Sequence, residues 1–158
     1  MSTARLTINL QSVAHNWRAL DAKTSVETGA VVKADGYGLG AGPVSWTLAD
    51  EGVRKFFVAA AEEGAVVREA IGKGPDVFVL SGHMEGDHEL LAAHNLIPMI
   101  NSPQQFQRHR EALPDHPIAI QLDSGMNRMG LEPADWAELR DEALALNPVV
   151  VMSHLACS

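Results

Sequence analysis

Short apolar segments alternate with helical patterns along most of the chain, and this alternation constrains the fold more than any other feature. Six segments have the length and apolar character of strands that are buried on both faces. They are Gly29–Val32, Phe56–Ala59, Asp76–Leu80, Ile97–Ile100, Ile118–Leu122 and Val149–Met152. Helical patterns lie between them at Pro43–Asp50, Ala61–Ile71, Asp87–Ala93, Pro103–Ala112 and Pro133–Leu146. The alternation predicts a parallel sheet joined by right-handed crossovers.

The segment ahead of this alternation has its own patterns. Leu6–Leu10 alternates apolar and polar side chains, which predicts a short strand. A helix is predicted at Ser12–Lys23, with Trp17 and Leu20 at helical spacing on one face and Ser12 as its N-cap.

Two architectures contain parallel strands joined by helices: an open doubly wound sheet and a (β/α)8 barrel. The turn Gly36-Tyr37-Gly38-Leu39-Gly40 lacks the glycine spacing of a dinucleotide-binding sheet and follows a lysine, so the barrel is favoured. A barrel needs eight strands and roughly 250 residues. Residues 1–158 are therefore expected to form the first six βα units of an α/β TIM-type barrel domain, truncated before closure. Unpaired first and sixth strands predict poor solubility of this piece in isolation.

Composition narrows the choice of partners and compartment. Hydrophobic residues make up 46% of the chain, enough for a sizeable core, and the net charge of -8 is spread without a basic patch. These features argue against nucleic acid or an anionic membrane as a partner. The single cysteine, Cys157, excludes an intrachain disulfide and fits a reducing, cytoplasmic setting. No segment has the pattern of a signal peptide or the length of a membrane span.

Lys33 follows directly on the apolar run Ala30–Val32 and opens the glycine-rich turn that contains Tyr37. Ammonium groups are costly to bury, so a lysine at the end of a core strand is unusual. Partial burial lowers the pKa of a lysine, and a neutral amine attacks aldehydes to form a Schiff base. The alternatives are a strand-end lysine that extends into water and a tyrosine that only occupies a turn.

Two further side chains hold equivalent positions after later strands. Arg128 follows the fifth barrel strand and His154 follows the sixth. Because the C-terminal ends of barrel strands open into one mouth, Lys33, Arg128 and His154 are expected to converge. A lysine amine can hold an aldehyde, an arginine can bind a carboxylate or phenolate, and a histidine can stack on an aromatic ring. Together they suggest a pyridoxal phosphate site that acts on an amino acid. Taken singly, Arg128 also fits a surface loop, and His154 a hydrogen-bonded strand end.

Three segments, in the same order and at the same separations, resemble the signatures of the alanine racemases. They are Val31-Val32-Lys33-Ala34-Asp35-Gly36-Tyr37-Gly38-Leu39-Gly40, Asp123-Ser124-Gly125-Met126-Asn127-Arg128-Met129-Gly130 and Ser153-His154-Leu155-Ala156. The resemblance covers the whole chain and the N-terminal part of a typical member. It implies a cytoplasmic, homodimeric, pyridoxal phosphate-dependent isomerase that interconverts L-alanine and D-alanine and supplies D-alanine for the peptidoglycan of the cell wall.

Roles for individual residues follow from the resemblance. Lys33 is expected to form the internal imine with pyridoxal phosphate and to act as one of two bases, on the D face. Tyr37 is expected to hydrogen-bond the cofactor phosphate, and His154 to pack against the pyridine ring. Arg128 is expected to contact the phenolic oxygen and the substrate carboxylate. The family's second base is a tyrosine from the C-terminal β-domain of a partner subunit, so the fragment, which lacks that domain, is expected to be inactive alone.

One position departs from the family pattern. Many members carry a lysine shortly before the second signature, modified by carbon dioxide, that positions the arginine. Gln121 is expected to stand there, and because an amide carries no carbamate, Arg128 needs a water, a bound anion or Gln121 itself. No metal is expected: the spacings of His83, His88 and His94 match no metal motif, and all three are predicted to be surface or loop residues.

Other functions stay open on the sequence alone. A non-catalytic pyridoxal phosphate-binding barrel protein would lack the second signature, and a decarboxylase of the same fold resembles only the first. A broad-specificity amino-acid racemase would share all three, and a truncated, non-functional product is a further alternative. A strand-rich domain with a late tyrosine beyond residue 158 would favour the racemase, whereas a stop soon after barrel closure would favour the non-catalytic protein.

Overall fold

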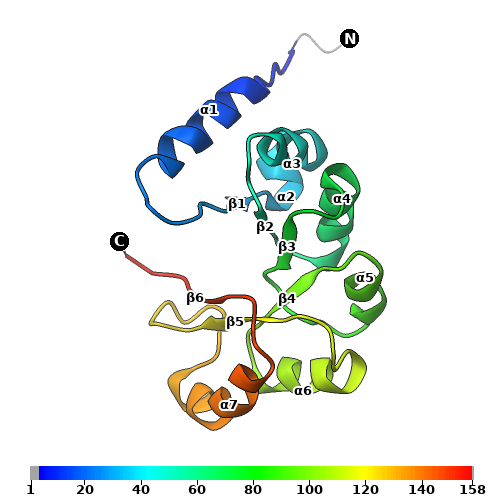
Figure 1. Cartoon of the computed structure of the whole chain (residues 1–158), viewed down its shortest axis with the longest axis vertical. Helices are drawn as coiled ribbons and strands as arrows, with labels where there is room; N and C mark the ends of the chain where they lie inside the picture. Colours follow the sequence, from blue (N-terminus) through cyan, green and yellow to red (C-terminus); the bar gives the residue numbers. More distant parts are fainter. Residues whose placement is uncertain (1–3, 158) are drawn as a thin grey trace.

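Six parallel strands form one curved sheet in the computed structural model, which describes residues 4–157 (Figure 1). The strands are β1 (Ala30–Val31), β2 (Lys55–Val58), β3 (Asp76–Val79), β4 (Ile97–Ile100), β5 (Ala119–Leu122) and β6 (Val151–Ser153). Each strand pairs with the next one in the chain. A doubly wound sheet reverses its strand order, whereas a barrel does not. The prediction of a barrel that is incomplete after six units is therefore confirmed.

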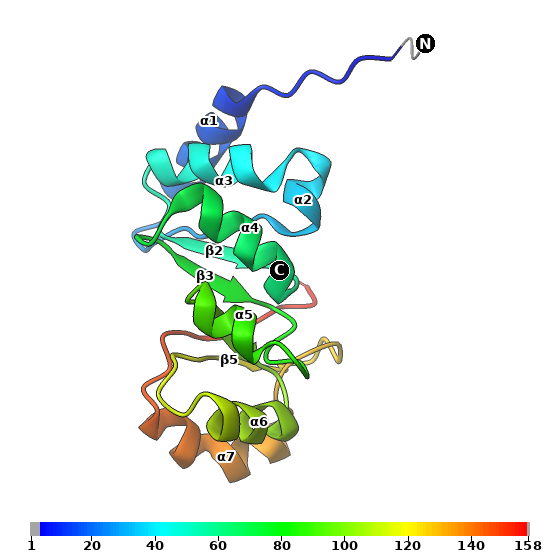
Figure 2. The same cartoon turned by 90° about the vertical axis from the view of Figure 1, so that its right-hand side faces the viewer.

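One helix precedes the first strand, and the other helices follow strands. The helices are α1 (Leu10–Asp21), α2 (Lys33–Gly38), α3 (Ala41–Asp50), α4 (Ala61–Ile71), α5 (His88–Ala93), α6 (Pro103–Ala112) and α7 (Pro133–Ala145). Figures 1 and 2 show α3 to α7 on one side of the strands, while the other side of the sheet has no helical cover. The bounds of α4, β4 and α6 are those predicted, and no helix among residues 4–157 is long and apolar enough to cross a membrane.

Side chains alternate between the two faces of the sheet and so separate two layers. Phe56 and Val58 of β2 are fully buried in a cluster that includes Val67 of α4, on the helix side. Phe57 lies between them in sequence and belongs to a different cluster, where its ring stacks on Phe78 with centroids 4.8 Å apart. Burying one such side chain stabilises the fold by about 1.5–3 kcal/mol. The layer that contains Phe57 and Phe78 faces the side of the sheet that no helix covers.

Both ends of the sheet are unpaired within the described part of the chain, as predicted. β1 pairs with β2 and β6 pairs with β5, and neither has a second neighbouring strand. Apolar side chains of these edge strands are exposed, Val31 at 47% and Val151 at 45%. Unpaired backbone donors and acceptors along such edges favour pairing with other chains. Poor solubility of the isolated piece stays a prediction, and the unpaired edges are its physical reason.

The predicted strand at Leu6–Leu10 is wrong. No residue from 4 to 9 belongs to a strand, Leu6 is 75% exposed, and α1 already begins at Leu10. The cause is Asn9, whose side-chain oxygen accepts the backbone N–H of Ser12 at 3.1 Å. Asn9 rather than Ser12 is therefore the N-cap, and a capped helix replaces the end of the predicted strand.

Candidate functional site

The edge strand β1 delivers Lys33 to the inner side of the sheet. Ala30 and Val32 are buried, whereas Val31 is exposed and lines the same cavity as Lys33. Successive side chains of a strand point to opposite faces, so Val31 and Lys33 share a face. Lys33 is half-buried there, at the point where the strand ends.

The four residues after Lys33 form one turn of left-handed helix. Residues 34–37 have φ between 52° and 63° and ψ between 38° and 51°. L-residues adopt this conformation at a cost of roughly 1–2 kcal/mol each, and only Gly36 among the four avoids it. A side chain at Gly36 would also meet the backbone nitrogen of Ala41 at 3.3 Å. The glycine-rich turn thus has a defined and strained conformation.

Two carboxylates hold this turn in place. Asp35 accepts the backbone N–H of Ala41 at 2.7 Å and ties the turn to the start of α3. Glu63 of α4 accepts the backbone N–H of Ala34 at 2.9 Å and that of Ala59 at 2.7 Å. Hydrogen bonds to ionised acceptors are about twice as strong as neutral ones, so these bonds offset part of the backbone strain.

Arg128 lies on a loop that leaves β5 and returns beside it. The backbone N–H of Asp123 donates to the Leu131 carbonyl at 2.9 Å, which closes the loop at its base. Inside the loop, the Asp123 carboxylate accepts the N–H groups of Gly125 at 2.8 Å and Asn127 at 3.2 Å. These backbone donors, Gly125 first, lower the pKa of Asp123. The loop is therefore shaped from within, and Arg128 itself is exposed.

Gln121 lies on β5 below this loop and is 4% exposed. Its side-chain amide donates to the carbonyl of Met129 at 3.4 Å, a long and weak bond. Met129 is the neighbour of Arg128, and all three residues line one cavity. Of the three possible means of positioning Arg128, this contact supports Gln121 itself.

The last strand brings His154 to the same mouth. His154 is exposed and follows Ser153, the final residue of β6. The hydroxyl groups of Ser153 and Ser124 are hydrogen-bonded to each other. The loop that carries Arg128 is therefore tied to the strand that delivers His154.

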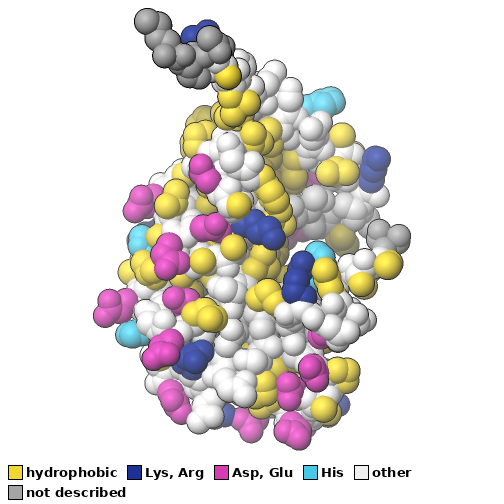
Figure 3. All heavy atoms as spheres, turned by 180° about the vertical axis from the view of Figure 1, so that it is seen from behind, with side chains coloured by type: hydrophobic (Ala, Val, Ile, Leu, Met, Phe, Trp, Pro, Cys, Tyr) yellow, Lys and Arg dark blue, Asp and Glu magenta, His cyan; other side chains and the backbone are white. Residues whose placement is uncertain are grey.

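All four predicted site residues, Lys33, Tyr37, Arg128 and His154, line one cavity of about 510 Å³. The other lining residues are mostly apolar: Val31, Phe57, Ala59, Leu80, Ser81, Gln121, Met129 and Met152. The cavity lies at the C-terminal ends of the strands, where barrel enzymes place their chemistry. Figure 3 shows a hollow on one face of the molecule, bordered by basic, histidine and hydrophobic side chains, with acidic ones mostly toward the margins. The predicted convergence is present.

The lining fits pyridoxal phosphate in chemistry and size. Lys33 offers a primary amine for an aldehyde, and Arg128 offers a planar cation for anionic oxygens. Tyr37 offers a hydroxyl donor, and Phe57 and Met152 supply apolar wall for an aromatic ring. Small-molecule sites commonly have volumes of roughly 300–1,000 Å³, so 510 Å³ is adequate. Within residues 4–157, no three or more His, Cys, Asp and Glu side chains are grouped to hold a metal ion.

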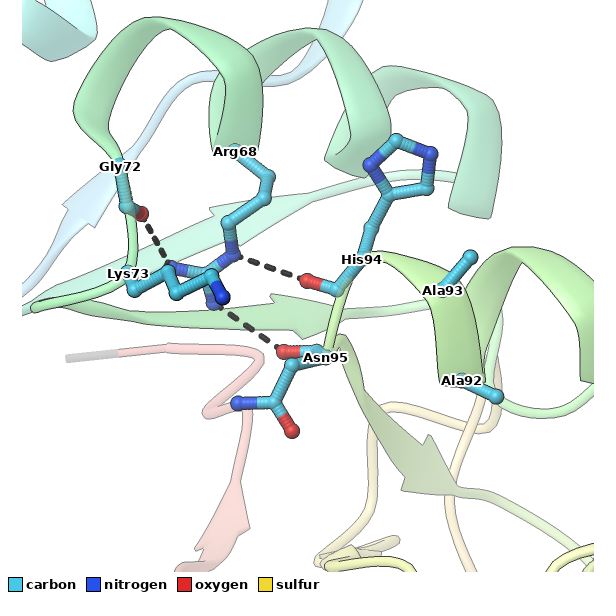
Figure 4. A pocket seen from close by; sticks show the side chains of 7 residues that line it. All are labelled: Arg68, Gly72, Lys73, Ala92, Ala93, His94 and Asn95. Carbon is cyan, nitrogen blue, oxygen red and sulfur yellow. Dashed lines mark hydrogen bonds between the residues drawn. The ribbon is translucent and has the colours of Figure 1, made fainter.

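A second cavity, of about 540 Å³, lies beside Arg68 and has a structural explanation (Figure 4). Arg68 is 7% exposed and donates to four backbone carbonyls, three of which are drawn in Figure 4. The acceptors are Gly72, Pro75, His94 and Asn95, at 2.7 to 3.1 Å. These carbonyls precede β3 and β4, on the face of a barrel that serves stability rather than catalysis. Since Nε, Nη1 and Nη2 are all engaged, Arg68 joins segments of the fold and offers no ligand site.

His83 lies in a loop, which the prediction of a surface or loop residue includes, but its side chain is buried, at 1% exposed. Its Nδ1 lies 3.1 Å from Nδ1 of His109 on α6, a partner that local spacing does not reveal. His88 is exposed and His94 is half-buried at the end of α5. Glu63 was also missed, although an acidic residue in the first turn of a helix after a strand is a recognisable capping signal.

Comparison with known proteins agrees with this geometry. Residues 8–158 match the family described as alanine racemase, N-terminal domain. An alanine racemase of Ruegeria sp. (strain TM1040) is 61% identical over 158 residues, which cover 100% of this chain and 46% of that protein. The chain thus spans about half the length of the curated relatives that it matches.

Two solved structures share the fold. Alanine racemase from Bartonella henselae, solved with covalently bound pyridoxal phosphate, has a TM-score of 0.86 at 29% identity and covers 94% of this chain and 46% of that one. Biosynthetic alanine racemase from Pseudomonas aeruginosa has a TM-score of 0.77 at 32% identity, covering 92% of this chain and 42% of that one. Sequence, fold and cavity agree, and the chain belongs to the alanine racemase N-terminal domain family.

Proposed function

We propose that residues 1–158 are the N-terminal part of the cofactor-binding barrel of an alanine racemase, an isomerase that uses pyridoxal phosphate to interconvert L-alanine and D-alanine. The observation that carries the proposal is the meeting of Lys33, Tyr37, Arg128 and His154 in one cavity. Alanine as the substrate is supported by relatives at up to 61% identity that carry the name alanine racemase.

Racemisation removes the α-proton of the amino acid from one face and returns a proton to the other. Pyridoxal phosphate, when bound, supplies a ring that delocalises the negative charge left on the α-carbon. Lys33 supplies the amine that holds the cofactor aldehyde carbon. Once the substrate amine has displaced it from that carbon, the freed Nζ would take or return the α-proton on the D face, as a general base or acid.

The other three residues bind and orient. Tyr37 would donate a hydrogen bond to the cofactor phosphate, and His154 would pack against the pyridine ring. Arg128 would contact the phenolic oxygen and bind the substrate carboxylate through its planar guanidinium fork. The loop bonds made by Asp123 support this task, because they fix the backbone on both sides of Met126 and so limit where Arg128 can lie.

A second base is needed on the opposite face of the substrate. We place it, together with a C-terminal β-domain, beyond residue 158 and in the partner subunit of a homodimer. The 158 residues alone are then inactive. The product D-alanine would serve peptidoglycan synthesis, in the cytoplasm.

The test is exchange of the α-proton, followed on the natively produced protein. In D2O, L-alanine should become D-alanine that carries deuterium at the α-carbon. Lys33→Ala should abolish this exchange, because no other amine in the cavity lining can replace it. Lys73→Ala is the matched control, since Lys73 is exposed and lines the cavity beside Arg68 instead.

Three results would redirect the proposal. Exchange at an unchanged rate in the Lys33 variant would refute the assigned role of Lys33. A wild-type protein that binds pyridoxal phosphate at Lys33 but exchanges no α-proton from any amino acid would be a non-catalytic cofactor-binding barrel. Exchange of several amino acids at similar rates would indicate a broad-specificity racemase.

A further inference from the structure

The hydrogen-bond ladder between β1 and β2 stops at the residue before Lys33. The backbone N–H of Val32 donates to the Phe57 carbonyl at 2.9 Å. In a regular parallel ladder the next two rungs would join the Ala59 N–H to the Val32 carbonyl and the Ala34 N–H to the Ala59 carbonyl. Both are replaced, because the N–H groups of Ala59 and Ala34 donate to the carboxylate oxygens of Glu63 instead.

The two oxygens of Glu63 are divided between the two strand ends. Oε1 accepts the Ala34 N–H at 2.9 Å, and Oε2 accepts the Ala59 N–H at 2.7 Å. The peptide group after Lys33 is thereby joined through one side chain to the end of β2. The Val32 carbonyl accepts the Gly36 N–H at 2.9 Å, so both peptide groups that flank Lys33 are hydrogen-bonded.

This anchoring decides which way Lys33 faces. Val32 is 2% exposed on the helix side, whereas Val31 and Lys33 line the cavity. The backbone leaves the extended conformation at Val32, where ψ is 22°, so the direction of Lys33 depends on how the peptide groups around it are held. The following left-handed turn costs free energy at Ala34, Asp35 and Tyr37, and it would relax toward ordinary dihedral angles if its first residue were released. Asp35 anchors the far end of the turn at Ala41. Glu63 is the side-chain anchor at its near end.

We propose that Glu63 is a positioning residue for Lys33: its carboxylate fixes the Lys33–Ala34 peptide and so aims the lysine amine into the cavity. The inference rests on the proposed function, because positioning Lys33 matters only if its amine holds the cofactor. Glu63 acts through Lys33 and touches neither the substrate nor the cofactor, since it is absent from the cavity lining.

The test compares Glu63→Ala with Glu62→Ala in the natively produced protein. Glu62 precedes Glu63 in the first turn of the same helix, carries the same charge and is exposed. Its substitution by alanine therefore removes the same favourable interaction with the helix dipole as Glu63→Ala does. The pyridoxal phosphate adduct on Lys33 is fixed with borohydride over a range of cofactor concentrations and quantified by peptide mass. Losing two charge-assisted bonds should raise the half-saturating concentration about tenfold or more in Glu63→Ala, and change it less than about twofold in Glu62→Ala.

A second readout separates positioning from mere stability. Backbone amide exchange over residues 33–38 should accelerate in Glu63→Ala at temperatures well below its melting point. Glu63→Gln retains the size of the side chain and one acceptor oxygen, so it should fold even if the alanine variant does not. Its half-saturating concentration should lie between those of wild type and Glu63→Ala, or above wild type if the alanine variant is unfolded.

The outcomes discriminate between the two proposals. Adduct formation and amide exchange that are the same in wild type, Glu63→Gln and Glu62→Ala would overturn the role of Glu63 and leave the proposed function intact. A lower melting temperature with unchanged adduct formation would also overturn it. Absence of any Lys33 adduct in the wild-type protein would instead overturn the proposed function.

Discussion

His83 and His109 form a buried pair, with their Nδ1 atoms 3.1 Å apart, that joins the loop after β3 to α6. His109 Nε2 lies 3.1 Å from the His116 carbonyl, which can only accept, so this nitrogen of His109 carries the proton. In the neutral ring Nδ1 of His109 is then the acceptor, and Nδ1–H of His83 donates to it. The pair is satisfied only while His109 is neutral.

This pair predicts a loss of stability in mild acid. Burial, and then electrostatic interaction with His109, Arg108, His88 and His116, lower the pKa of His83 from 6.5 to about 4, and burial also lowers the pKa of His109. Between these pH values the unfolded chain binds a proton that the folded chain does not. The free energy of unfolding should therefore fall as pH falls from about 6.5 to about 4, by on the order of 3 kcal/mol for His83.

Urea unfolding of the natively produced protein at a series of pH values measures this effect. His83→Asn removes the titrating ring and should flatten the dependence in that window. His88→Gln, in which an exposed histidine is replaced, is the control and should retain the slope. Equal slopes in the two variants would show that the acid sensitivity arises elsewhere.

Asp123 predicts a separate, lower pH window for the loop that carries Arg128. Its pKa lies below the ordinary 3.8, because backbone N–H groups bind the ionised carboxylate. A depressed carboxylate pKa stabilises the folded loop above the unfolded value, and the stabilisation is lost as pH falls through the folded pKa, below about 3.8. Asp123→Ala should therefore raise KM for alanine at neutral pH, since it releases the loop. Steady-state kinetics check this, and an unchanged KM would separate loop order from substrate binding.

Closing the same loop requires a glycine at position 130. Gly130 has φ of 112°, and a side chain there would lie 2.7 Å from the Asp123 nitrogen and the Leu122 carbonyl carbon. Gly125 has a similar φ of 121° but no atom within 4 Å of an added side chain. Gly130→Ala should thus destabilise by roughly 1–3 kcal/mol more than Gly125→Ala, because only the first adds a steric clash to backbone strain. Thermal melting compares them, and equal losses would contradict the close approach of the backbone at Gly130.

Arg68 should matter for stability and not for the site. Arg68→Ala leaves four buried or half-buried carbonyls without their donor, which should cost at least about 3 kcal/mol. Arg110→Ala breaks an exposed pair with Glu142 and a cation–π contact with the Phe106 ring, and it should cost less than about 2 kcal/mol. Chemical denaturation measures both. A decrease in cofactor affinity in Arg68→Ala at temperatures where it is fully folded would argue against a purely structural role.

Much of the fold was predictable because its signals are local. The sequence predicts the exact bounds of three elements, Ala61–Ile71, Ile97–Ile100 and Pro103–Ala112. Their signals, which are the spacing of apolar residues and a proline in the first turn, lie within the element itself. The strand at Leu6–Leu10 failed because strand formation requires a partner strand, whereas Asn9 caps a helix on its own. Convergence of Lys33, Arg128 and His154 followed from topology alone.

The unpredicted parts depend on contacts between distant segments. Neither the burial of His83 against His109 nor the bond from Ala34 to Glu63 leaves a local pattern. The left-handed turn at residues 34–37 contradicts local preference at three of its four positions, so only the surrounding contacts could define it. Such departures concentrate where the proposed chemistry lies.

The proposed chemistry depends on Lys33 holding pyridoxal phosphate, and borohydride reduction of the natively produced protein is the decisive test. Reduction fixes any imine as a stable adduct, which intact mass detects and peptide mapping locates. We expect one pyridoxyl group per chain, on Lys33. A protein without an adduct, or with the adduct on Lys23, Lys55 or Lys73 and Lys33 unmodified, would refute this role.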